Sequence, residues 1–484
     1  RRYIMTAQTI LPANTLSSGY DVANSVRFNG GDSAKFNIDH SGAGNRDLWT
    51  LSMWVKRSGL GAEEPLFNSR PNANFETFCG FAADDTLVFK QKNDGSTSGQ
   101  YVTTRKFRDV SAWYHFVFVY DKDNSTAGNR GRIYVNGVEE TLFGTESNFS
   151  DSSTWNSTNT NNIGNSQSAY FDGYMCEIVF IDGQALTPAS FGEFDSDSSS
   201  IWKPIDVSGL TPGTNGFWLD FKDGSNLGNN AFGSGSADWT ETNIAATEQS
   251  TDTCTNNACT WNTLYRNGAT FTQGNLVYQA PGSNPVFGSI TTFGVSAGKW
   301  YAECKYHAGS SHYGIIGICD EVFATLNDLG SATNTDFGKT GAALGSHPQN
   351  CTVAYVINTG KIRNNNNNQN YGSGGGDGDI INIALDRDNR KVYFGINGTY
   401  ENSGDPAAGS NGFDISGQVT GDTYFLGVTN DTGASETTAE FNFGAGATTA
   451  ISSTNADANG HGNFEYAVPS GFYAWNTKNL AEFG

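Results

Sequence analysis

Charged side chains are scarce in this sequence of 484 residues, and long apolar runs are missing. Asp, Glu, Lys and Arg make up 16% of the chain, against roughly 25% in an average globular protein. Asn, Ser, Thr and Gly must therefore supply most of the polar surface. No apolar segment approaches the roughly 18 residues that a transmembrane helix needs, so we expect no membrane insertion. The opening from Arg1 to Met5 lacks the apolar core of a secretory signal.

Signatures of catalysis and of metal binding are missing as well. The six histidines include no HExxH pair, and no GxSxG elbow, P-loop or dinucleotide fingerprint occurs. The seven cysteines are an odd number without metal-like spacing, which favours small buried residues over a disulfide framework. One disulfide, between Cys254 and Cys259, stays open as an alternative. These absences predict a protein that is not an enzyme and needs no cofactor.

Acidic residues outnumber basic residues in this chain. The formal net charge is −21, and the acidic residues are spread along the sequence. Such a surface repels phosphate backbones, so we expect no nucleic-acid binding. Carboxylates that lie close together could bind divalent cations, and Asp121, Asp123 and Asn124 place oxygen ligands in one loop. They are a candidate calcium site, although an acidic composition also produces such clusters by chance.

Glycine, aromatic residues and alternation with a period of two are abundant. Gly occurs 59 times and aromatics make up 13% of the chain, which is typical of many short strands joined by turns. Helical patterning is almost absent; residues 187–194 and 321–329 could each hold a turn or two. Asn136-Gly137 and Asn397-Gly398 are strong hairpin signals. In the first half, strands are predicted at residues 25–30, 49–56, 113–120, 132–135 and 174–181.

Strand patterning weakens in the middle of the chain and returns in the second half. Residues 201–270 are rich in Ser, Gly, Thr and Asn with isolated aromatics, which predicts an ordered bridge that packs on its neighbours. The low-complexity tract 363–379 is typical of a long flexible loop. Further strands are predicted at residues 299–303, 313–318, 352–357, 380–385, 391–396, 423–428 and 440–443. The fold class is therefore all-β, with two antiparallel β-sandwiches of jelly-roll type.

Several phrases of the sequence resemble known families. SVRFNGGD (25–32), WTLSMWVKR (49–57), WYHFVFVYD (113–121), RIYVNGV (132–138) and the segment 170–192 resemble laminin-G-like, concanavalin-like jelly rolls. GKWYAE (298–303), GDIINIALD (378–386), KVYFGING (391–398) and FNFG (441–444) resemble a SPRY domain. The order of these parts, with DTCTNNACTWN (252–262) between them, is similar to virion structural proteins of marine bacteriophages.

This resemblance implies a domain plan. It comprises an N-terminal arm (1–19), a laminin-G-like jelly roll (20–200), the bridge (201–270), a SPRY-like sandwich (271–476) and a tail (477–484). In the proteins that this chain resembles, the phrase at 474–482 leads into further sequence. Because the chain also begins at Arg1 instead of Met, we expect a processed product or a fragment.

The resemblance also implies binding and assembly. The expected function is a non-enzymatic virion surface protein, such as a tail fibre, spike or head fibre, that adheres to host-surface glycan. The alternative is a purely structural capsid-decoration or fibre subunit. The implied partners are other virion proteins and a host cell-surface glycan, with a homo-oligomer as a further expectation. The implied location is the virion surface, outside the cell.

Candidate glycan-binding residues lie in or beside predicted loops of the second sandwich. His312, Tyr313, Asn370 and Tyr371 combine aromatic rings, which stack on sugar faces, with an amide that bonds hydroxyls. The competing interpretation is that these residues close the ends of the sandwich. Both interpretations remain open at this point.

Two further motifs are similar to functional sites but favour simpler interpretations. Glu193, Asp195 and Asp197 have the alternating carboxylate spacing of concanavalin-like polysaccharide-cleaving enzymes. The segment has no strand pattern, so we expect a solvated turn. Residues 374–379 (GGGDGD) resemble one calcium-binding β-roll repeat, but such a structure needs stacked copies. We expect a glycine-rich turn that leads into the strand at Ile380.

Overall fold

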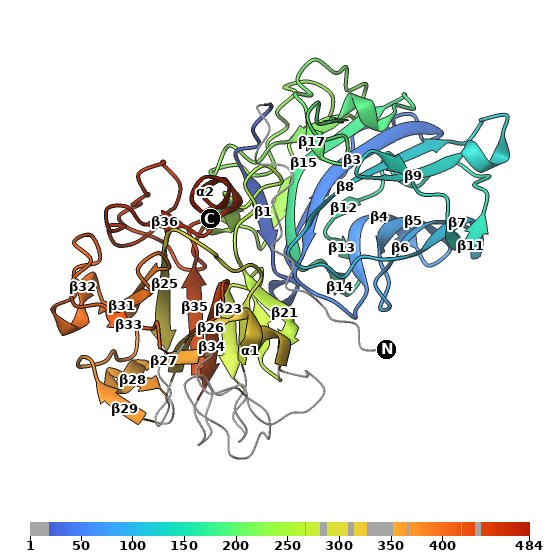
Figure 1. Ribbon diagram of the computed structural model, residues 1–484. Coiled ribbons are helices and arrows are strands. Elements are labelled where there is room, and N and C mark those ends of the chain that lie inside the picture. Colours follow the sequence, from blue (N-terminus) through green and yellow to red (C-terminus); the bar gives the residue numbers. More distant parts are fainter. Residues whose placement is uncertain are drawn as a thin grey trace. The chain divides into compact units, whose positions relative to one another are not determined.

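A computed structural model of the chain describes residues 19–266, 268–280, 288–307, 314–326, 352–364, 367–417, 419–430 and 437–484. The chain divides into two compact units, which meet in sequence between Asn257 and Ala258. Each unit is built mainly from antiparallel sheets (Figure 1), so the predicted all-β class is confirmed. In these ranges, no helix has the length and apolarity that crossing a bilayer requires.

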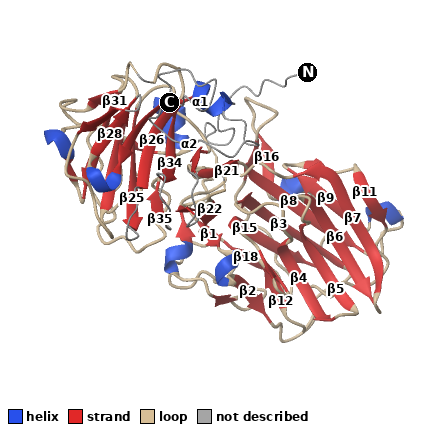
Figure 2. Cartoon of the chain, turned by 90° about the horizontal axis from the view of Figure 1, so that it is seen from below, coloured by secondary structure: helices blue, strands red, loops and turns tan. Residues whose placement is uncertain are grey.

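The described residues of the first unit form two eight-stranded sheets (Figure 2). One sheet has the order β10 (Val138–Glu139), β9 (Gly131–Val135), β8 (Trp113–Asp121), β3 (Leu48–Arg57), β15 (Gly173–Asp182), β1 (Ser25–Phe28) and β20 (Gln249–Ser250), with β18 (Phe217–Leu219) paired to β15. The other has the order β11 (Phe143–Ser147), β7 (Ser96–Lys106), β6 (Thr86–Asn93), β5 (Phe75–Phe81), β4 (Glu64–Asn72), β12 (Asn161–Ile163), β2 (Lys35–Ile38) and β19 (Thr240–Thr242). Two short pairs, β13 (Asn165–Ser166) with β14 (Ala169–Tyr170) and β16 (Gly192–Phe194) with β17 (Trp202–Pro204), complete the unit.

Aromatic side chains fill the space between these two sheets. Trp49 on β3 stacks on Tyr120 of β8 with ring centroids 5.3 Å apart, and Phe118 lies in the same cluster. The strand predicted at residues 113–120 forms β8, and it is apolar on both faces. Its alternate residues Val117 and Val119 belong to a second cluster on the opposite face of the sheet. A strand that is covered on both faces can be apolar throughout, because neither face meets water.

The segment predicted as a bridge is part of the two units. Phe217 and Trp239 lie in the core between the two sheets, whereas Trp202 and Trp218 cover the outer face of the sheet that contains β8. Strands β18, β19 and β20 pair with β15, β2 and β1 of the same unit. Trp261, in contrast, is buried in the core of the second unit. The segment is ordered, as expected, but it forms no separate element, because its aromatic residues gain more burial within the sandwiches.

The described residues of the second unit form a seven-stranded and a nine-stranded sheet. The first has the order β21 (Trp261–Arg266), β24 (Gly288–Thr291), β34 (Tyr424–Asn430), β26 (Gly314–Asp320), β27 (Thr352–Val356), β28 (Lys361–Asn364) and β29 (Asn367–Asn370). The second has the order β22 (Thr270–Thr272), β23 (Val277–Ala280), β35 (Thr437–Asn442), β25 (Lys299–His307), β30 (Ile380–Asp386), β31 (Lys391–Ile396) and β32 (Thr399–Tyr400). In addition, β33 (Phe413–Asp414) pairs with β31, and β36 (Tyr473–Ala474) pairs in parallel with β25.

The C-terminal segment of the second unit covers part of the outer face of the nine-stranded sheet. Tyr301, Tyr393, Phe464 and Phe472 form a buried cluster on that face. The residues predicted as a tail form helix α2 (Thr477–Phe483), capped by the side chain of Asn476. Only part of the sheet is covered in this way, and the candidate site lies beside the covering cluster.

Local signals gave correct predictions at the turns and at the short helices. Asn136 and Asn397 have left-handed backbones, as do the glycines that follow them, and both dipeptides join hairpin strands. A 3-10 helix forms at Pro188–Ser190, and helix α1 occupies Glu321–Leu326.

The predicted flexible loop at 363–379 is partly wrong. Strand β29 pairs with β28 through Ile362 and Gln369, so the Asn-rich tract contributes an edge strand. The extended backbone pairs with its neighbour without needing apolar side chains. Because the prediction used side-chain composition, it did not detect this pairing.

Candidate functional site

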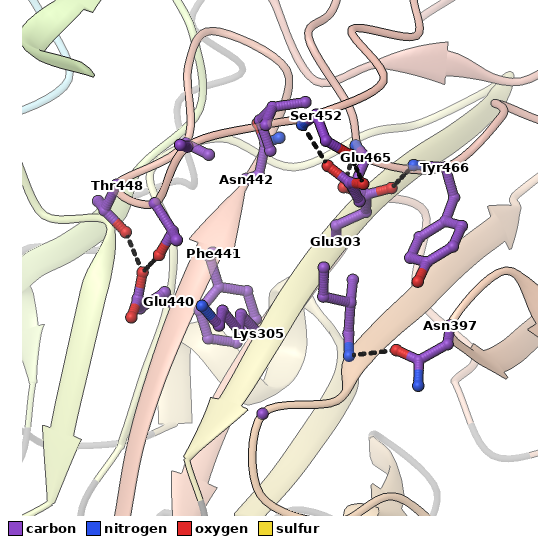
Figure 3. Close-up of a pocket in the computed structure, with 16 residues that line it drawn as sticks. Glu303, Lys305, Asn397, Glu440, Phe441, Asn442, Thr448, Ser452, Glu465 and Tyr466 are labelled. Carbon is purple, nitrogen blue, oxygen red and sulfur yellow. Dashed lines mark hydrogen bonds between the residues drawn. The ribbon is translucent and has the colours of Figure 1, made fainter. Parts of the chain in front are cut away.

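A cavity of about 340 Å³ lies on the outer face of the nine-stranded sheet in the second unit. Its floor comes from β25, β35 and the start of β30, and its walls come from segments 447–452 and 465–466 (Figure 3). Ligand pockets in proteins span about 300–1,000 Å³, so this cavity has room for one small ligand. Its described lining combines apolar, amide, hydroxyl and charged side chains.

Strand alternation places the polar residues of β25 at the cavity. Trp300, Cys304 and Tyr306 point into the core of the sandwich. Since successive side chains of a strand point to opposite faces, Glu303 and Lys305 lie on the outer face. Both line the cavity, and Glu440 on the neighbouring strand β35 lies there too. The charged floor is therefore a direct result of the register between these two strands.

Glu303 connects the sheet to the wall of the cavity. Its carboxylate accepts hydrogen bonds from the backbone N–H groups of Glu465 (2.9 Å) and Tyr466 (2.8 Å) and from the hydroxyl of Tyr301 (2.9 Å). Only 3% of Glu303 is exposed, and this burial raises the pKa of its carboxyl group despite these hydrogen bonds. Glu303 thereby fixes the backbone at Tyr466 against the sheet.

A glycine allows the ring of Tyr466 to approach the hairpin at Asn397. Gly398 has a φ of 82°, and a β-carbon at this position would lie 2.5 Å from Cδ1 of Tyr466. A larger residue would therefore be strained and would displace the ring. Asn397 itself is held in place, because its oxygen accepts from the backbone of Ile380 and its amide donates to Asp379.

The wall segment 447–452 is held by a carboxylate of the floor. Glu440 accepts hydrogen bonds from the hydroxyls of Thr448 (2.6 Å) and Thr449, and Nε2 of His307 lies 2.6 Å from its other oxygen. Burial alone raises the pKa of Glu440, but these three contacts outweigh that effect and lower it. Glu440 therefore remains ionised under neutral conditions and keeps the wall in place.

A second carboxylate holds the end of the same segment. Glu465 accepts from the backbone N–H of Ser452 (2.7 Å), from the hydroxyl of that residue and from Ser453. The hydroxyl of Ser452 is the largest cause that lowers the pKa of Glu465. Asn442 is also engaged, since its amide donates to the backbone of Asn463 and its oxygen accepts from Gly444.

Of the candidate glycan residues, the described Asn370 and Tyr371 do not line this cavity. His312 and Tyr313 are outside the described residues. Tyr371 is 6% exposed and packs in the sandwich core, with its ring near Tyr355 and Phe394. The interpretation that Tyr371 closes the sandwich is therefore the one that the structure supports. Asn370 is exposed at the end of edge strand β29, so a role in binding there stays a prediction.

The cavity was not predicted from the sequence, because only its floor, and not its wall, has a recognisable local sequence pattern. Alternating polar residues at Glu303, Lys305 and His307 in an otherwise apolar strand could have indicated a polar outer face. The wall segment 447–452 has no strand pattern, and its hydroxyl residues are typical of any loop.

The candidate calcium ligands lie in the turn after β8. The amide of Asn124 donates to Oδ2 of Asp121 at 2.8 Å, and Lys122 donates to Asp123 at 2.8 Å. Hydrogen bonds of the loop itself thus occupy oxygens that were predicted as ligands. In the described ranges, no three His, Cys, Asp or Glu residues are grouped to hold a metal. Calcium binding at this loop stays a prediction.

The carboxylates that resembled a glycosidase motif are paired with a lysine. Nζ of Lys203 lies 3.3 Å from both Glu193 and Asp195, and Asp195 accepts from the backbone of Asp197 and Ser198. The expectation of no strand is wrong for Glu193, which belongs to β16 and pairs with Lys203 on β17. Asp195 starts the turn that was expected. Because Lys203 bridges the two carboxylates, they do not lie free on a cleft.

Three other expectations can be compared with the structure. Gly376 donates to Asp379 in a turn before β30, as predicted for the glycine-rich motif. His115, which lies within the strand predicted at residues 113–120, is 1% exposed and therefore a packed residue. Cys254 and Cys259 are buried thiols, so the disulfide that was left open is absent among the described residues.

Comparisons with known proteins bear on the fold. Residues 28–190 match the family Laminin_G_3, described as the concanavalin A-like lectin/glucanases superfamily. The sequence has no match among curated proteins.

Several solved structures are similar in part. The SPRY domain of human HERC1 shares 14% identity, with 37% of this chain and 96% of that chain covered and a TM-score of 0.27. A heptameric SAP-like pentraxin from Limulus polyphemus shares 18% identity, with 35% and 80% covered and a TM-score of 0.27. A protein from Bacteroides ovatus, named as a putative carbohydrate binding protein, shares 13% identity, with 47% and 60% covered and a TM-score of 0.33. The first unit of this chain is thus similar over residues 28–190 to the concanavalin A-like lectin/glucanases superfamily.

Proposed function

We propose that this chain is a non-catalytic carbohydrate-binding protein and that the cavity of the second unit holds the sugar. The observation that carries this proposal is the composition of the cavity. Apolar side chains such as Ile380 and Ile451 lie beside carboxylates, amides and the ammonium of Lys305. Sugars need both kinds of contact, because their ring faces are apolar and their edges carry hydroxyl groups that donate and accept hydrogen bonds.

A glycan array probed with the full chain tests this proposal. The variant Ala447→Phe places a ring in the cavity, and Ala407→Phe places the same ring on an exposed loop of the same unit. We expect the unmodified chain and Ala407→Phe to bind the same glycans and Ala447→Phe to lose them. Unchanged binding by Ala447→Phe would assign the sugar to another surface. An array without any bound glycan would contradict the proposal.

A second candidate function is glycoside hydrolysis in the same cavity. The pKa of Glu303 is raised and the pKa values of Glu440 and Glu465 are lowered. Carboxyl groups with separated pKa values can serve as general acid and as nucleophile or base. Binding is favoured because each of these carboxyl groups already accepts three hydrogen bonds from the protein. Release of reducing sugar by the chain, lost in Glu303→Gln, would establish hydrolysis instead.

The resemblance to phage virion proteins supports a proposal for where this binding takes place. We propose that the chain is displayed on a virion, contacts other virion proteins and adheres to a host-surface glycan, with a homo-oligomer as its form. The alternative is a decoration or fibre subunit whose loops contact only neighbouring subunits. A cryo-EM map of the native particle separates these proposals. The cavity facing outward would support adhesion, whereas a cavity buried between subunits would support decoration.

A further inference from the structure

A lysine, an aspartate and an asparagine meet at the end of the first unit. Nζ of Lys56 lies 2.7 Å from Oδ2 of Asp252 and 2.8 Å from Oδ1 of Asn257. Lys56 and Asp252 are each 1% exposed, whereas Asn257 is half-buried. None of the three lines the cavity of the second unit, so the proposed sugar binding does not involve them. The cluster brings an amine, a carboxyl group and a carboxamide within hydrogen-bond distance of one another.

Strand register places Lys56 in a row of aromatic residues. Lys56 of β3 pairs with Trp113 of β8 on one side and with Tyr174 of β15 on the other. Its Nζ lies 5.7 Å from the centroid of the Tyr174 ring, and the indole N–H of Trp113 donates to Oδ1 of Asp252 at 3.0 Å. Both rings belong to a buried cluster. The amine and the carboxyl group are therefore fixed in position and shielded from water.

The carboxamide of Asn257 is oriented with its oxygen toward this amine. Its Nδ2 donates to the backbone oxygen of Ser111 at 2.6 Å, so Oδ1 faces Lys56. The carbonyl carbon lies one C=O bond of about 1.2 Å beyond Oδ1 and is thus within about 4 Å of Nζ. Reacting atoms in productive arrangements are about 3–3.5 Å apart. A small rotation of the Lys56 side chain covers the difference.

We propose that Lys56 and Asn257 form an intramolecular isopeptide bond, with Asp252 as the catalytic acid and base. Nζ bonds to Cγ of Asn257, and the bond from Cγ to Nδ2 breaks. Asp252 accepts the two protons that Nζ loses, passes one of them to Nδ2, which leaves as ammonia, and keeps the other. The reaction consumes no further reactant. It is independent of the proposed sugar binding.

The surroundings favour this reaction over its reversal. The reaction converts a buried ammonium and a buried carboxylate into a neutral amide and a neutral carboxyl group, which cost less to keep away from water. Asn257 is half-buried, so the ammonia can leave, whereas the burial of Lys56 and Asp252 limits the access of water that would hydrolyse the product.

The bond ties a central strand to the end of the first unit. Asn257 is the last residue of that unit, and Lys56 lies on β3 in the middle of a sheet. Without the bond, the nearest strand before Asn257 is β20, which is held to β1 by a short pairing of Ser250 with Ser25 and of Gln249 with Val26. With the bond, a force on the chain beyond Asn257 acts on β3 through covalent bonds.

Mass spectrometry of the purified full chain tests this proposal. We expect the chain to be lighter than its sequence by one ammonia molecule. Trypsin should release residues 47–57 joined to residues 223–266 as one branched peptide, because it does not cleave after an acylated lysine. This peptide distinguishes the isopeptide bond from a succinimide at an Asn-Gly pair, whose formation also releases ammonia. Linear peptides in which Lys56 and Asn257 are both unmodified overturn the proposal.

Variants assign the two roles. Asn257→Ala removes the carboxamide and should abolish the branched peptide, whereas Asn256→Ala changes the neighbouring half-buried residue and should leave its amount unchanged. Asp252→Asn keeps the size of the side chain but accepts no proton, and it should lower the amount of branched peptide about tenfold or more. A branched peptide that persists in Asn257→Ala overturns the proposed bond, and an unchanged amount in Asp252→Asn overturns the role of Asp252. The measurement on the unmodified chain does not depend on whether these variants fold.

Discussion

The buried imidazole of His115 makes the stability of the first unit depend on pH in a way that can be calculated. The indole N–H of Trp202 lies 2.9 Å from Nδ1, the hydroxyl oxygen of Ser52 lies 2.8 Å from Nε2, and the ring of Trp54 stacks 4.6 Å away. Because an indole N–H can only donate, Nδ1 must accept. The neutral ring therefore carries its hydrogen on Nε2 and donates it to Ser52.

Protonation of this ring destabilises the folded state. Burial lowers the pKa of His115 from 6.5 to about 3, because the charged imidazolium would lose its hydration. Protonation would also place an N–H at Nδ1 against that of Trp202. Between these two pKa values the unfolded chain binds a proton that the folded chain does not, so the free energy of unfolding decreases as the pH falls. The unfolded-state pKa alone sets the size of this loss between about pH 7 and pH 5, which is about 2 kcal/mol.

The variant His115→Gln isolates this contribution. Urea unfolding of the full chain is followed by tryptophan fluorescence at about pH 7 and at about pH 5. The transition that the substitution shifts gives the free energy of unfolding of the first unit. The variant should be less stable at about pH 7 by roughly 1–3 kcal/mol, since Gln replaces the two hydrogen bonds imperfectly. It should, however, lose about 2 kcal/mol less than the unmodified chain on going to about pH 5. Equal losses, within about 0.5 kcal/mol, would refute the assignment of a neutral buried imidazole.

Two further predictions compare matched positions. Gly137→Ala and Gly183→Ala both replace a glycine with positive φ, but only at Gly137 would the new β-carbon lie 2.4 Å from the ring of Trp202. Gly183→Ala should lower the free energy of unfolding by about 1–2 kcal/mol, and Gly137→Ala should lower it clearly more. Thermal unfolding measures both losses, and equal losses would contradict a clash with Trp202. Lys56→Met removes the partner of a buried carboxylate 2.7 Å away and should cost about 3–5 kcal/mol. Lys122→Met breaks an exposed pair of 2.8 Å and should change stability by less than about 0.5 kcal/mol; similar losses in the two variants would show that burial does not decide the effect.

The parts of the fold that the sequence predicts are those with local causes. The hairpins at Asn136 and Asn397 depend on two residues whose backbones must be left-handed, and strand β8 shows in its own composition that both of its faces are buried. Such features need no information about distant residues, which explains why turns and central strands were placed correctly.

Long-range strand pairing could not be predicted from the sequence, and the reason is physical. Ser250 pairs with Ser25 at the other end of the first unit, and Phe217 pairs with Phe180 on β15. Nothing in either segment distinguishes its partner from other edge strands of similar composition. The bridge was therefore separated from a sandwich to which most of it belongs. The cavity was missed for the same reason, because its wall at 447–452 is held by Glu440 and Glu465, which are not part of that segment.

The outer faces of the two sheets are covered to different extents in the two units, and this difference explains where the cavity lies. In the first unit, clusters around Trp202 and Trp218 cover the outer face of the sheet that contains β8, and His115 and Glu177 are buried beneath them. In the second unit, the cluster around Phe464 covers only part of the nine-stranded sheet. Where that cover ends, the side chains of β25 change from Tyr301, which is fully buried, to Glu303 and then to Lys305, which is half-buried in the cavity lining. A buried ammonium without a partner would be costly, and Lys305, which has no ion pair within the part of the chain that the structure describes, lies at a position that solvent can reach. The alternation of side chains along β25 thus also places the ammonium of Lys305 in the cavity lining at the edge of the covering cluster.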